Sequence, residues 1–147
     1  FMRVYKIIFL FFAMLLVSCE FLDDTIKTPV ITACDSNAMV DPILYQQIQT
    51  TKYGITSVVL NGDCLEITVS SSGCDSNNWS MNLVTVPSTA TVVPQLYHGK
   101  VELINDEVCL AVFQKTKSFD LTPLKIQSQN KIQVDIDGWN TPIIYSY

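Results

Sequence analysis

Alternating apolar and polar residues predict short β-strands over most of the chain from Ile55 onward. The clearest case is a hairpin around Asn61-Gly62-Asp63, which follows the β-rich run Ile55–Leu60. After the turn, Leu65, Ile67 and Val69 lie on one face and polar residues alternate with them. A period of two is typical of a half-buried strand, because successive side chains point to opposite faces. Two such runs around a glycine-containing turn predict a β-hairpin.

Further strands are predicted along the rest of the chain. Trp79 shares one strand face with Met81 and Leu83, so we expect its indole in the core; this strand ends at Pro87. The other predicted strands are Lys100–Asn105, Cys109–Lys115, Ser118–Leu121, Leu124–Gln127 paired with Lys131–Ile136, and Pro142–Tyr147.

Three segments rich in turn residues are predicted to lie outside regular strands. Ser70–Asn78 is rich in Ser, Gly, Asp and Asn, which is typical of a loop. Ser88–Pro94 is bounded by prolines, which confine it to a bulge or a sheet edge. Tyr97-His98-Gly99 is interpreted as a turn before the next strand.

One short helix is predicted near the start of this region. Asp41 can cap it and Pro42 can occupy its first position, where proline is tolerated. Ile43, Leu44 and Ile48 would then face the core, and the helix would fray near Thr50. Together with about seven to nine short strands, this predicts an all-β fold, an antiparallel β-sandwich of immunoglobulin-like type. Residues 34–147 would form a single domain.

The first nineteen residues have the layout of a secretory signal peptide. Arg3 and Lys6 precede the apolar run Ile7–Val17. Leu16-Val17-Ser18-Cys19 has the form that a bacterial lipoprotein signal peptidase recognises before the cysteine receives lipid. We therefore expect a signal peptide over residues 1–18 and lipidation of Cys19. A membrane-spanning helix fits less well, because it needs about 20 apolar residues, and ordinary secretion lacks a pair of small residues before the cut.

The segment that follows is predicted to be a flexible acidic tether over residues 19–33. Two or more acyl chains hold a protein on a membrane almost permanently, so the tether would carry a soluble domain above the lipid surface. Asp24-Thr25-Ile26 makes Thr25 a candidate O-glycosylation acceptor, against the simpler reading of an unmodified linker. Asn78-Trp79-Ser80 has the form of an N-glycosylation acceptor.

The cysteines indicate two disulfides. Once Cys19 carries lipid, Cys34, Cys64, Cys74 and Cys109 remain, an even number for an oxidising compartment. Three connectivities are open, and we favour Cys34–Cys64 with Cys74–Cys109, because each pair joins separate predicted strands. Zinc spacings are absent, so we predict neither a metal site nor a cofactor.

The charge balance excludes a nucleic-acid partner. Removing the signal segment takes away Arg3 and Lys6, which leaves seven lysines against fourteen acidic residues and a net charge of −7. A nucleic-acid-binding protein needs a basic face.

Catalytic chemistry has few candidates. His98 is the single histidine, and no G-x-S-x-G motif surrounds a serine, so a Ser-His-Asp triad is not favoured. Asp135 and Asp137 share one strand face, where a solvated pair is a simpler interpretation than a glycosidase acid and base. The remaining acidic alternative is a weak Ca²⁺ site built from loop carboxylates: Asp63, Asp75, Asp106 and Glu107.

Aromatic residues are the candidate binding groups. Trp139 follows Gly138 in a predicted turn, where its ring would be partly exposed, and Tyr97, Tyr145 and Tyr147 can join it. Exposed Trp and Tyr rings are suited to stacking on sugars, while the alternative is that these rings only close one end of the core.

The chain as a whole resembles small uncharacterised outer-membrane lipoproteins of Bacteroidota. The resemblance rests on Leu16–Cys19, on the acidic tether, and on phrases such as Ser72-Gly73-Cys74-Asp75 and Ser118-Phe119-Asp120-Leu121. It implies a lipid-anchored protein of the outer membrane, with an acidic tether of the kind found on surface-exposed lipoproteins, and it brings no catalytic residue. The leading hypothesis is a non-enzymatic binding or structural module for a glycan or an envelope protein. The alternatives are a hydrolase of envelope polymers and an inhibitor of secreted proteases.

Overall fold

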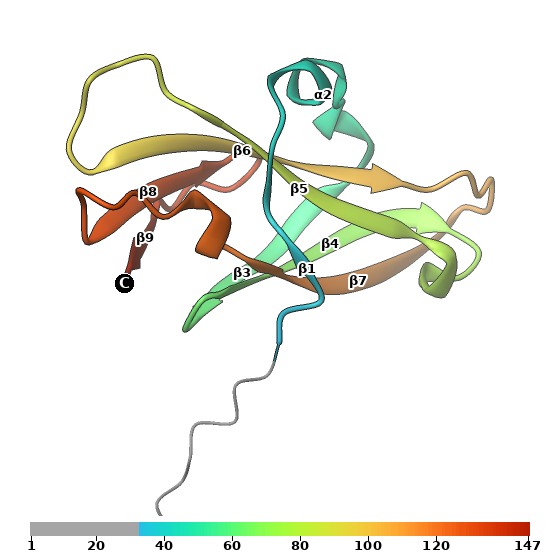
Figure 1. The fold of residues 1–147 in the computed structure, drawn as a ribbon. Helices are drawn as coiled ribbons and strands as arrows, with labels where there is room; N and C mark the ends of the chain where they lie inside the picture. The colour runs from blue at the N-terminus through green and yellow to red at the C-terminus, as the bar shows by residue number, and fades with distance from the viewer. Residues whose placement is uncertain (1–32) are drawn as a thin grey trace, which may run out of the picture. The chain divides into compact units, whose positions relative to one another are not determined.

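Residues 33–147 are described by a computed structural model, and they form nine strands and one short α-helix (Figure 1). Each of the two sheets includes one two-residue strand from the start of this region. The first has the strand order β1-β7-β4-β3 and the second has the order β2-β5-β6-β8-β9. The strands are β1 (Ser36–Asn37), β2 (Met39–Val40), β3 (Gly54–Asn61), β4 (Cys64–Gly73), β5 (Ser80–Pro87), β6 (Gln95–Ile104), β7 (Ala111–Asp120), β8 (Lys131–Ile136) and β9 (Ile143–Ser146).

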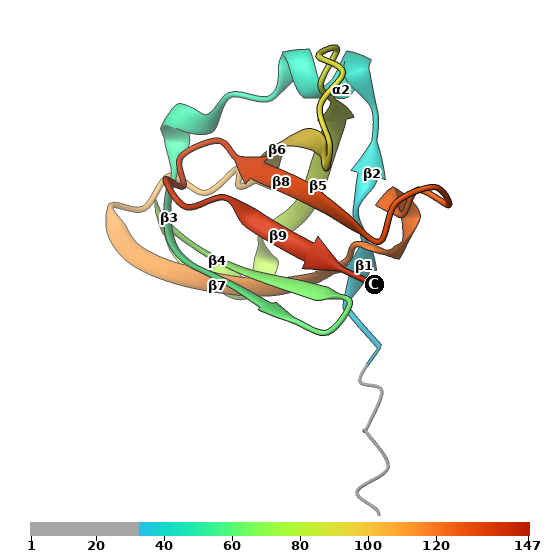
Figure 2. The same ribbon diagram turned by 90° about the vertical axis from the view of Figure 1, so that its left-hand side faces the viewer.

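The expected all-β fold with one short helix is confirmed. Four pairings are antiparallel, but β1 with β7, β2 with β5, and β6 with β8 are parallel. The antiparallel expectation was therefore incomplete. The parallel pairings of β1 and β2 arise because the segment from β1 to β2 runs past both sheets and adds one short strand to each (Figure 2). The parallel pairing of β6 with β8 arises because the chain passes through β7 of the other sheet between these two strands. Among residues 33–147, no helix is long and apolar enough to cross a membrane.

The hairpin predicted around residue 62 is formed by β3 and β4. Gly62 has a φ of +60°, the sign that a type II′ turn requires at its first central position. Strand β4 then continues to Gly73, so the expected loop over Ser70–Asn78 was wrong in its first part. Its serines remain in the strand because β4 pairs with β7 over ten consecutive residues. Only the later part leaves the sheet, with a 3-10 turn at Ser76–Asn78.

Three other boundaries differ from the expectation. Tyr97-His98-Gly99 lies inside β6, because this segment pairs with both β5 and β8. The expected strands over 109–115 and 118–121 are one strand, β7. Leu124–Gln127 does not pair with β8; a 3-10 turn at Thr122–Leu124 takes the start of this segment, and β8 pairs with β6 and β9.

The helix α2 (Pro42–Gln47) begins as predicted. Asp41 Oδ1 accepts hydrogen bonds from the backbone N–H groups of Ile43 and Leu44, at 3.0 and 2.9 Å. Ile48 is buried, but the Ile43 side chain is 73% exposed, so the expected core position of Ile43 was wrong. The helix has only six residues and contacts β5 with one side, which leaves the Ile43 side in solvent. A separate 3-10 turn, Thr50–Lys52, follows it.

The core lies between the facing sides of the two sheets. Leu65, Ile67 and Val69 of β4 are fully buried there, as the alternation predicts. From the second sheet, Ile132 and Val134 of β8 are equally buried. The rest of this core cluster comes from β5 to β9 and from the segments beside the strands: Ala38, Met81, Leu83, Tyr97, Val101, Phe119, Leu121, Leu124, Ile136, Ile143 and Tyr145.

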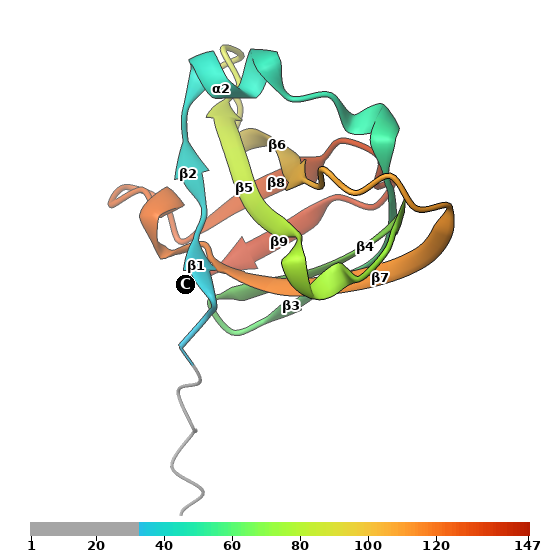
Figure 3. The same cartoon turned by 90° about the vertical axis from the view of Figure 1, so that its right-hand side faces the viewer.

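Strands β5 and β7 lie at neighbouring edges of the two sheets (Figure 3), and two lysines of β7 bind backbone oxygens of β5 and of the residue before it. Strand β2 covers β5 only at Val84 and Thr85, and β1 covers only the last two residues of β7. In the remaining gap, Lys115 Nζ donates to the backbone oxygen of Trp79, and Lys117 Nζ donates to that of Met81 at 2.8 Å. Unpaired strand edges invite association with other chains, and lysines are a common means of blocking them.

Candidate functional site

The connection between β6 and β7 carries the most exposed apolar side chains of the described region. Val108 is 90% exposed and Leu110 is 91% exposed, and Val112 at the start of β7 is 72% exposed. Apolar residues that remain in solvent as a group mark surfaces that contact other molecules. This connection lies at the right-hand end in Figure 1, beyond the ends of β4 and β6. We define residues 108–112 as the apolar loop.

A single carboxylate holds the base of the apolar loop. Glu107 Oε2 accepts hydrogen bonds from the backbone N–H groups of Cys74 and Asp75, at 2.7 and 3.0 Å. It also accepts one from Trp79 Nε1 at 2.9 Å. These hydrogen bonds, with that from the Asp75 N–H contributing most and that from the Trp79 indole next, lower the pKa of Glu107. The carboxylate therefore remains ionised and joins the loop to the segment after β4.

The disulfide Cys74–Cys109 reinforces the same junction, with 5.0 Å between the two Cα atoms. Gly73 makes this close approach feasible: a Cβ at this position would lie 2.6 Å from Glu107 Oε2 and 2.7 Å from Trp79 Cζ2. The Trp79 side chain is 3% exposed, which confirms its expected core position. Both disulfides of the structure have the pairing that the sequence favours.

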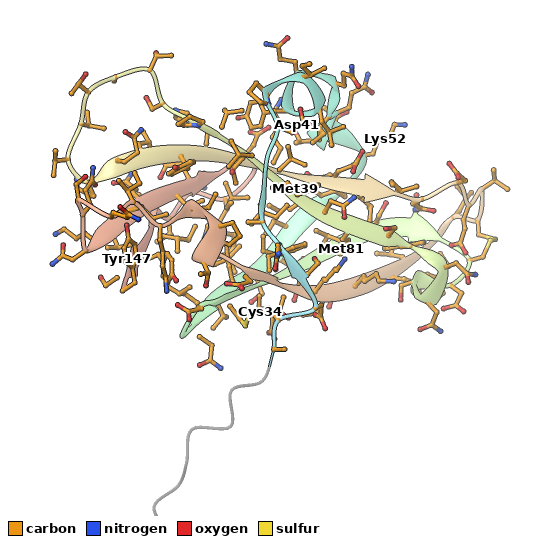
Figure 4. The ribbon with its side chains drawn as sticks, viewed as in Figure 1. Cys34, Met39, Asp41, Lys52, Met81 and Tyr147 are labelled. Atoms are coloured by element: carbon orange, nitrogen blue, oxygen red, sulfur yellow. A yellow bond between two sulfur atoms is a disulfide. The ribbon has the colours of Figure 1, made fainter. Side chains whose placement is uncertain are left out.

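A mostly polar cleft of about 670 Å³ adjoins the base of the loop. On one wall, Asn105 Nδ2 donates to the backbone oxygen of Ser72 at 2.8 Å, and Asn105 Oδ1 accepts from the N–H of Glu107 at 3.0 Å. The other wall is formed by the segment from Leu44 to Lys52, and Figure 4 labels Lys52 at the end of this segment. The lining residues are Leu44, Gln47, Ile48, Gln49, Lys52, Ser71, Ser72, Glu102, Leu103, Ile104, Asn105, Asp106 and Glu107.

A second concavity, of about 420 Å³, lies by the β5–β6 connection at the opposite end. Val93 is exposed there to 84%, but its loop lacks a comparable frame. Hydrogen bonds hold it at its base, where the N–H of Ser88 donates to Leu96 O at 2.8 Å and Gln95 Nε2 donates to Ser88 O at 3.2 Å. This end is therefore less well suited to presenting a fixed surface.

The carboxylates considered for a Ca²⁺ site do not form one. Asp75 and Glu107 are neighbours, but Glu107 is occupied by three hydrogen bonds. Asp63 lies at the other disulfide, where it binds Tyr145 and Lys125. Within residues 33–147, no group of three or more His, Cys, Asp or Glu side chains is arranged to hold a metal ion.

The candidate catalytic groups are not arranged as a triad. His98 lies within β6, and the strand register places Asp135 on one side of it and Val86 on the other. Asp135 Oδ1 accepts a hydrogen bond from Gln133 Nε2 at 2.9 Å. Asp137 Oδ2 accepts one from Thr50 Oγ1 at 2.7 Å. The two sheet neighbours of His98 are thus Asp135 and Val86, and neither is a Ser or Cys nucleophile.

The aromatic candidates contribute mainly to the core. Tyr145 is 1% exposed and Tyr97 is 9% exposed, so neither presents a face on which a sugar ring can stack. Trp139 is half-buried and packs against the core. Tyr147 packs against it too, and its ring centroid lies 5.2 Å from that of Tyr145. The expected sugar-binding platform was wrong for the two buried tyrosines, since the end of the core covers their rings.

The tyrosine cluster is organised by Asp63. The hydroxyl of Tyr145 donates to Asp63 Oδ1, and Lys125 Nζ lies 3.1 Å from the same oxygen. The Tyr145 hydroxyl, followed by Lys125, lowers the pKa of Asp63. Because Asp63 precedes Cys64, this cluster fixes the β3–β4 turn and the C-terminal strand to the Cys34–Cys64 disulfide. It is a structural junction.

The modification sites are divided between two regions. Cys19 and Thr25 lie outside the described residues, so their predicted modifications stay predictions, as does the signal peptide. Asn78 lies in the 3-10 turn before β5 and its side chain is exposed.

Comparison with known proteins identifies the fold but not a family. No protein-family model matches the chain, and no curated protein does so either. Among solved structures, a protein of unknown function, DUF1344, from Bacteroides vulgatus ATCC 8482 is similar, with a TM-score of 0.51 and 18% identity over 76% of this chain and 56% of that chain. A NigD-like immunity protein from Bacteroides caccae ATCC 43185 has a TM-score of 0.51 and 11% identity over 74% of this chain and 57% of that chain.

These similarities support the β fold alone, because the sequence identities are low. The chain spans little more than half the length of either neighbour. Both neighbours come from Bacteroides, which agrees with the resemblance to Bacteroidota proteins. One neighbour is of unknown function and the other is of immunity-protein type, so neither indicates an enzyme.

The apolar loop is not distinguished from a buried strand by its sequence pattern. Val108, Leu110 and Val112 alternate with other residues in the same way as buried strand positions do. The pattern therefore predicts a strand, but it does not distinguish a face that packs on the core from one that stays in solvent. The available signal was the combination of these residues with Asp106, Glu107 and Cys109, which makes a short connection tied by a disulfide.

Proposed function

We propose that this chain is a lipid-anchored protein of the bacterial outer membrane whose β domain acts by binding a protein partner, without catalysis. Cys19 would carry the lipid and residues 20–33 would form the tether. The observation that carries the proposal is the apolar loop: Val108 and Leu110 are about nine-tenths exposed, while Glu107 and Cys109 fix the backbone beside them.

Burial of this loop in a partner would provide the binding free energy. Covering one Val or Leu side chain contributes about 1.5–3 kcal/mol, and the loop exposes three such residues. A fixed loop also loses little conformational entropy on binding, which favours affinity. Anchor residues of this kind, surrounded by a polar rim, are typical of protein interfaces.

A protein partner agrees with the comparisons better than a substrate does. One neighbour is of immunity-protein type, and we propose that this chain likewise acts on its partner through contact. Hydrolysis of envelope polymers has less support, since neither strand neighbour of His98 is a Ser or Cys nucleophile, and other side chains already donate hydrogen bonds to Asp135 and Asp137.

The anchor is tested by expressing the full chain in its own organism with an alkyne-labelled fatty acid. We expect label on the protein, and loss of both the label and the membrane association in Cys19→Ala. Ser18→Ala, which leaves a small residue before the cysteine, is the matched control and should keep both. Equal membrane association of Cys19→Ala and the unmodified chain would contradict lipid anchoring.

The binding surface is tested by site-specific photo-crosslinking in intact cells. A photoreactive residue at position 110 should give one discrete protein adduct. The same residue at position 43 is the matched control, because Ile43 is also an exposed apolar side chain, at 73%, but lies on α2. Adducts of equal yield and pattern from the two positions would contradict a binding role for the loop.

A further inference from the structure

The apolar loop is a continuous extended run of exposed residues. All five residues from Val108 to Val112 are exposed. The last two belong to β7, which pairs with β4 on one side only at this point: Ala111 lies opposite Gly73, and Val112 lies opposite Ser72. Strand β1 reaches the other side of β7 only at Phe119 and Asp120. Before the two lysines that block the rest of this edge, residues 111–112 therefore present apolar side chains and a short edge that no other strand pairs.

The loop is held on both sides of Leu110. On the N-terminal side, Cys109 is bonded to Cys74, and Glu107 binds the N–H groups of Cys74 and Asp75. On the C-terminal side, the pairing of Ala111 with β4 begins at once. The side chain of Leu110 projects into solvent from a backbone that is fixed before any partner arrives.

We propose that this loop inserts into the active-site cleft of serine endopeptidases that have an apolar primary specificity pocket, and inhibits them. This inference rests on the proposed binding function and names the class of partner. Leu110 would occupy the specificity pocket, as an apolar side chain fits the hydrophobic slot of chymotrypsin-type enzymes. Val108 and Val112 would flank it, and the free edge of the loop would pair with the backbone of the enzyme as an added strand.

The geometry favours an inhibitor over an ordinary substrate. If the peptide bond between Leu110 and Ala111 is hydrolysed, water adds across it and leaves a carboxylate on Leu110 and an amine on Ala111. The new ends do not separate, since the disulfide retains Cys109 and strand pairing retains Ala111. The product stays in place, and the enzyme remains blocked.

Charge disfavours a lipid surface as the occupant. Asp106 is exposed next to the apolar loop, and Asp75 is exposed across the disulfide. Membrane surfaces with anionic lipids attract basic residues, whereas these two carboxylates would be repelled.

The test measures inhibition of chymotrypsin and of subtilisin by the full-length protein, purified in detergent, with a small chromogenic substrate as the readout. We expect an inhibition constant below about 1 μM for both enzymes, within the range of protein interfaces of this type. Leu110→Asp should raise this constant roughly 30-fold or more, the loss that follows removal of a central anchor residue. Ile43→Asp, on α2, should not change it.

A change of specificity separates pocket recognition from general stickiness. Trypsin has an aspartate in its specificity pocket, so the unmodified protein should not inhibit it, whereas Leu110→Lys should inhibit trypsin and lose inhibition of chymotrypsin. Since Leu110 is exposed, both variants should keep the circular dichroism spectrum of the parent.

The inference is overturned if neither enzyme is inhibited at 10 μM protein, or if both cut the loop and release the fragments. A discrete adduct from position 110 to a protein that is not an endopeptidase would also overturn it while the proposed binding function stands. Absence of inhibition together with absence of any adduct from position 110 would contradict both the inhibitor inference and the proposed binding function. Binding of the purified protein to anionic vesicles through Leu110 would favour a membrane role instead.

Discussion

The two ends of the domain that contain a disulfide are built from similar groups but differ in how much of their apolar surface is buried. At one end, Cys34–Cys64 lies beside Asp63, whose carboxylate binds the hydroxyl of the buried Tyr145. At the other, Cys74–Cys109 lies beside Glu107, whose carboxylate binds two backbone N–H groups and an indole. Each junction combines a disulfide with an ionised acid and buries the ring that this acid binds, but the second junction also leaves Val108 and Leu110 in solvent.

This comparison distinguishes apolar side chains that stabilise the fold from apolar side chains that remain exposed to a partner. Tyr145 and Leu110 are both large and apolar, yet their exposures are 1% and 91%. The Cys74–Cys109 disulfide and Glu107 therefore hold a surface around Leu110 that contributes nothing to the core. Removing the same kinds of group from each end tests this difference most directly.

The largest effect is expected from Tyr145→Ala. Removing a buried aromatic ring leaves a cavity and should lower the free energy of unfolding by about 3–5 kcal/mol, measured by denaturant titration. Tyr145→Phe, which keeps the ring and removes the hydroxyl, should cost about 1 kcal/mol. Equal effects of the two substitutions would show that the hydroxyl, not the ring, holds this end.

Removal of either disulfide should come next. The loops closed by the two bonds are similar in length, with sequence separations of 30 and 35, so the chain-entropy model gives a similar loss for each, about 2–4 kcal/mol. The pairs to compare are Cys34→Ser with Cys64→Ser, and Cys74→Ser with Cys109→Ser. A loss confined to one pair would contradict the view that both ends stabilise the fold.

Acidification should give a smaller effect at both ends. The pKa values of Asp63 and Glu107 are lowered in the folded protein. The stabilisation from each carboxylate is therefore fully present above the ordinary carboxyl pKa of about 4, and it is lost as the pH falls through the lower pKa of the folded state. We expect Asp63→Asn and Glu107→Gln each to flatten the decline of the unfolding free energy below about pH 4.5, by at most one proton per molecule. Unchanged slopes would mean that neither carboxylate is stabilised by its contacts.

The smallest effect on stability is expected at the apolar loop. Val108→Ala and Leu110→Ala should each change the free energy of unfolding by less than about 0.5 kcal/mol, as is usual for exposed positions. The same denaturant titration checks this. A loss above about 1.5 kcal/mol would show that these side chains pack on something in the folded protein.

The parts of the fold that the sequence predicts are those determined by local pattern. The β3–β4 hairpin follows from Gly62 and the alternation after it, and the start of α2 follows from Asp41 and Pro42. The disulfide pairing also follows, because the cysteines flank separate strands. Long-range pairing was less accessible: the serines after Val69 suggest a loop, yet β7 holds them in a strand.

The candidate site illustrates the same limit. Glu107 lies well away from Cys74 and Trp79 in the sequence, and only the fold brings its carboxylate to both. Tyr145 shows the converse, since we expected its ring as a candidate for sugar stacking while the Asp63 cluster encloses it. Periodicity predicts which side chains share a face, but not whether that face meets the core or the solvent.

The proposed function requires that the Cys74–Cys109 disulfide and Glu107 hold the apolar loop rigid in the free protein. Backbone ¹⁵N relaxation of residues 108–112 tests it directly. We expect order parameters of about 0.85 in the unmodified protein, as in the sheets, and a fall below about 0.6 when Cys74 and Cys109 are both replaced by Ser. Values below about 0.6 in the unmodified protein would contradict the claim.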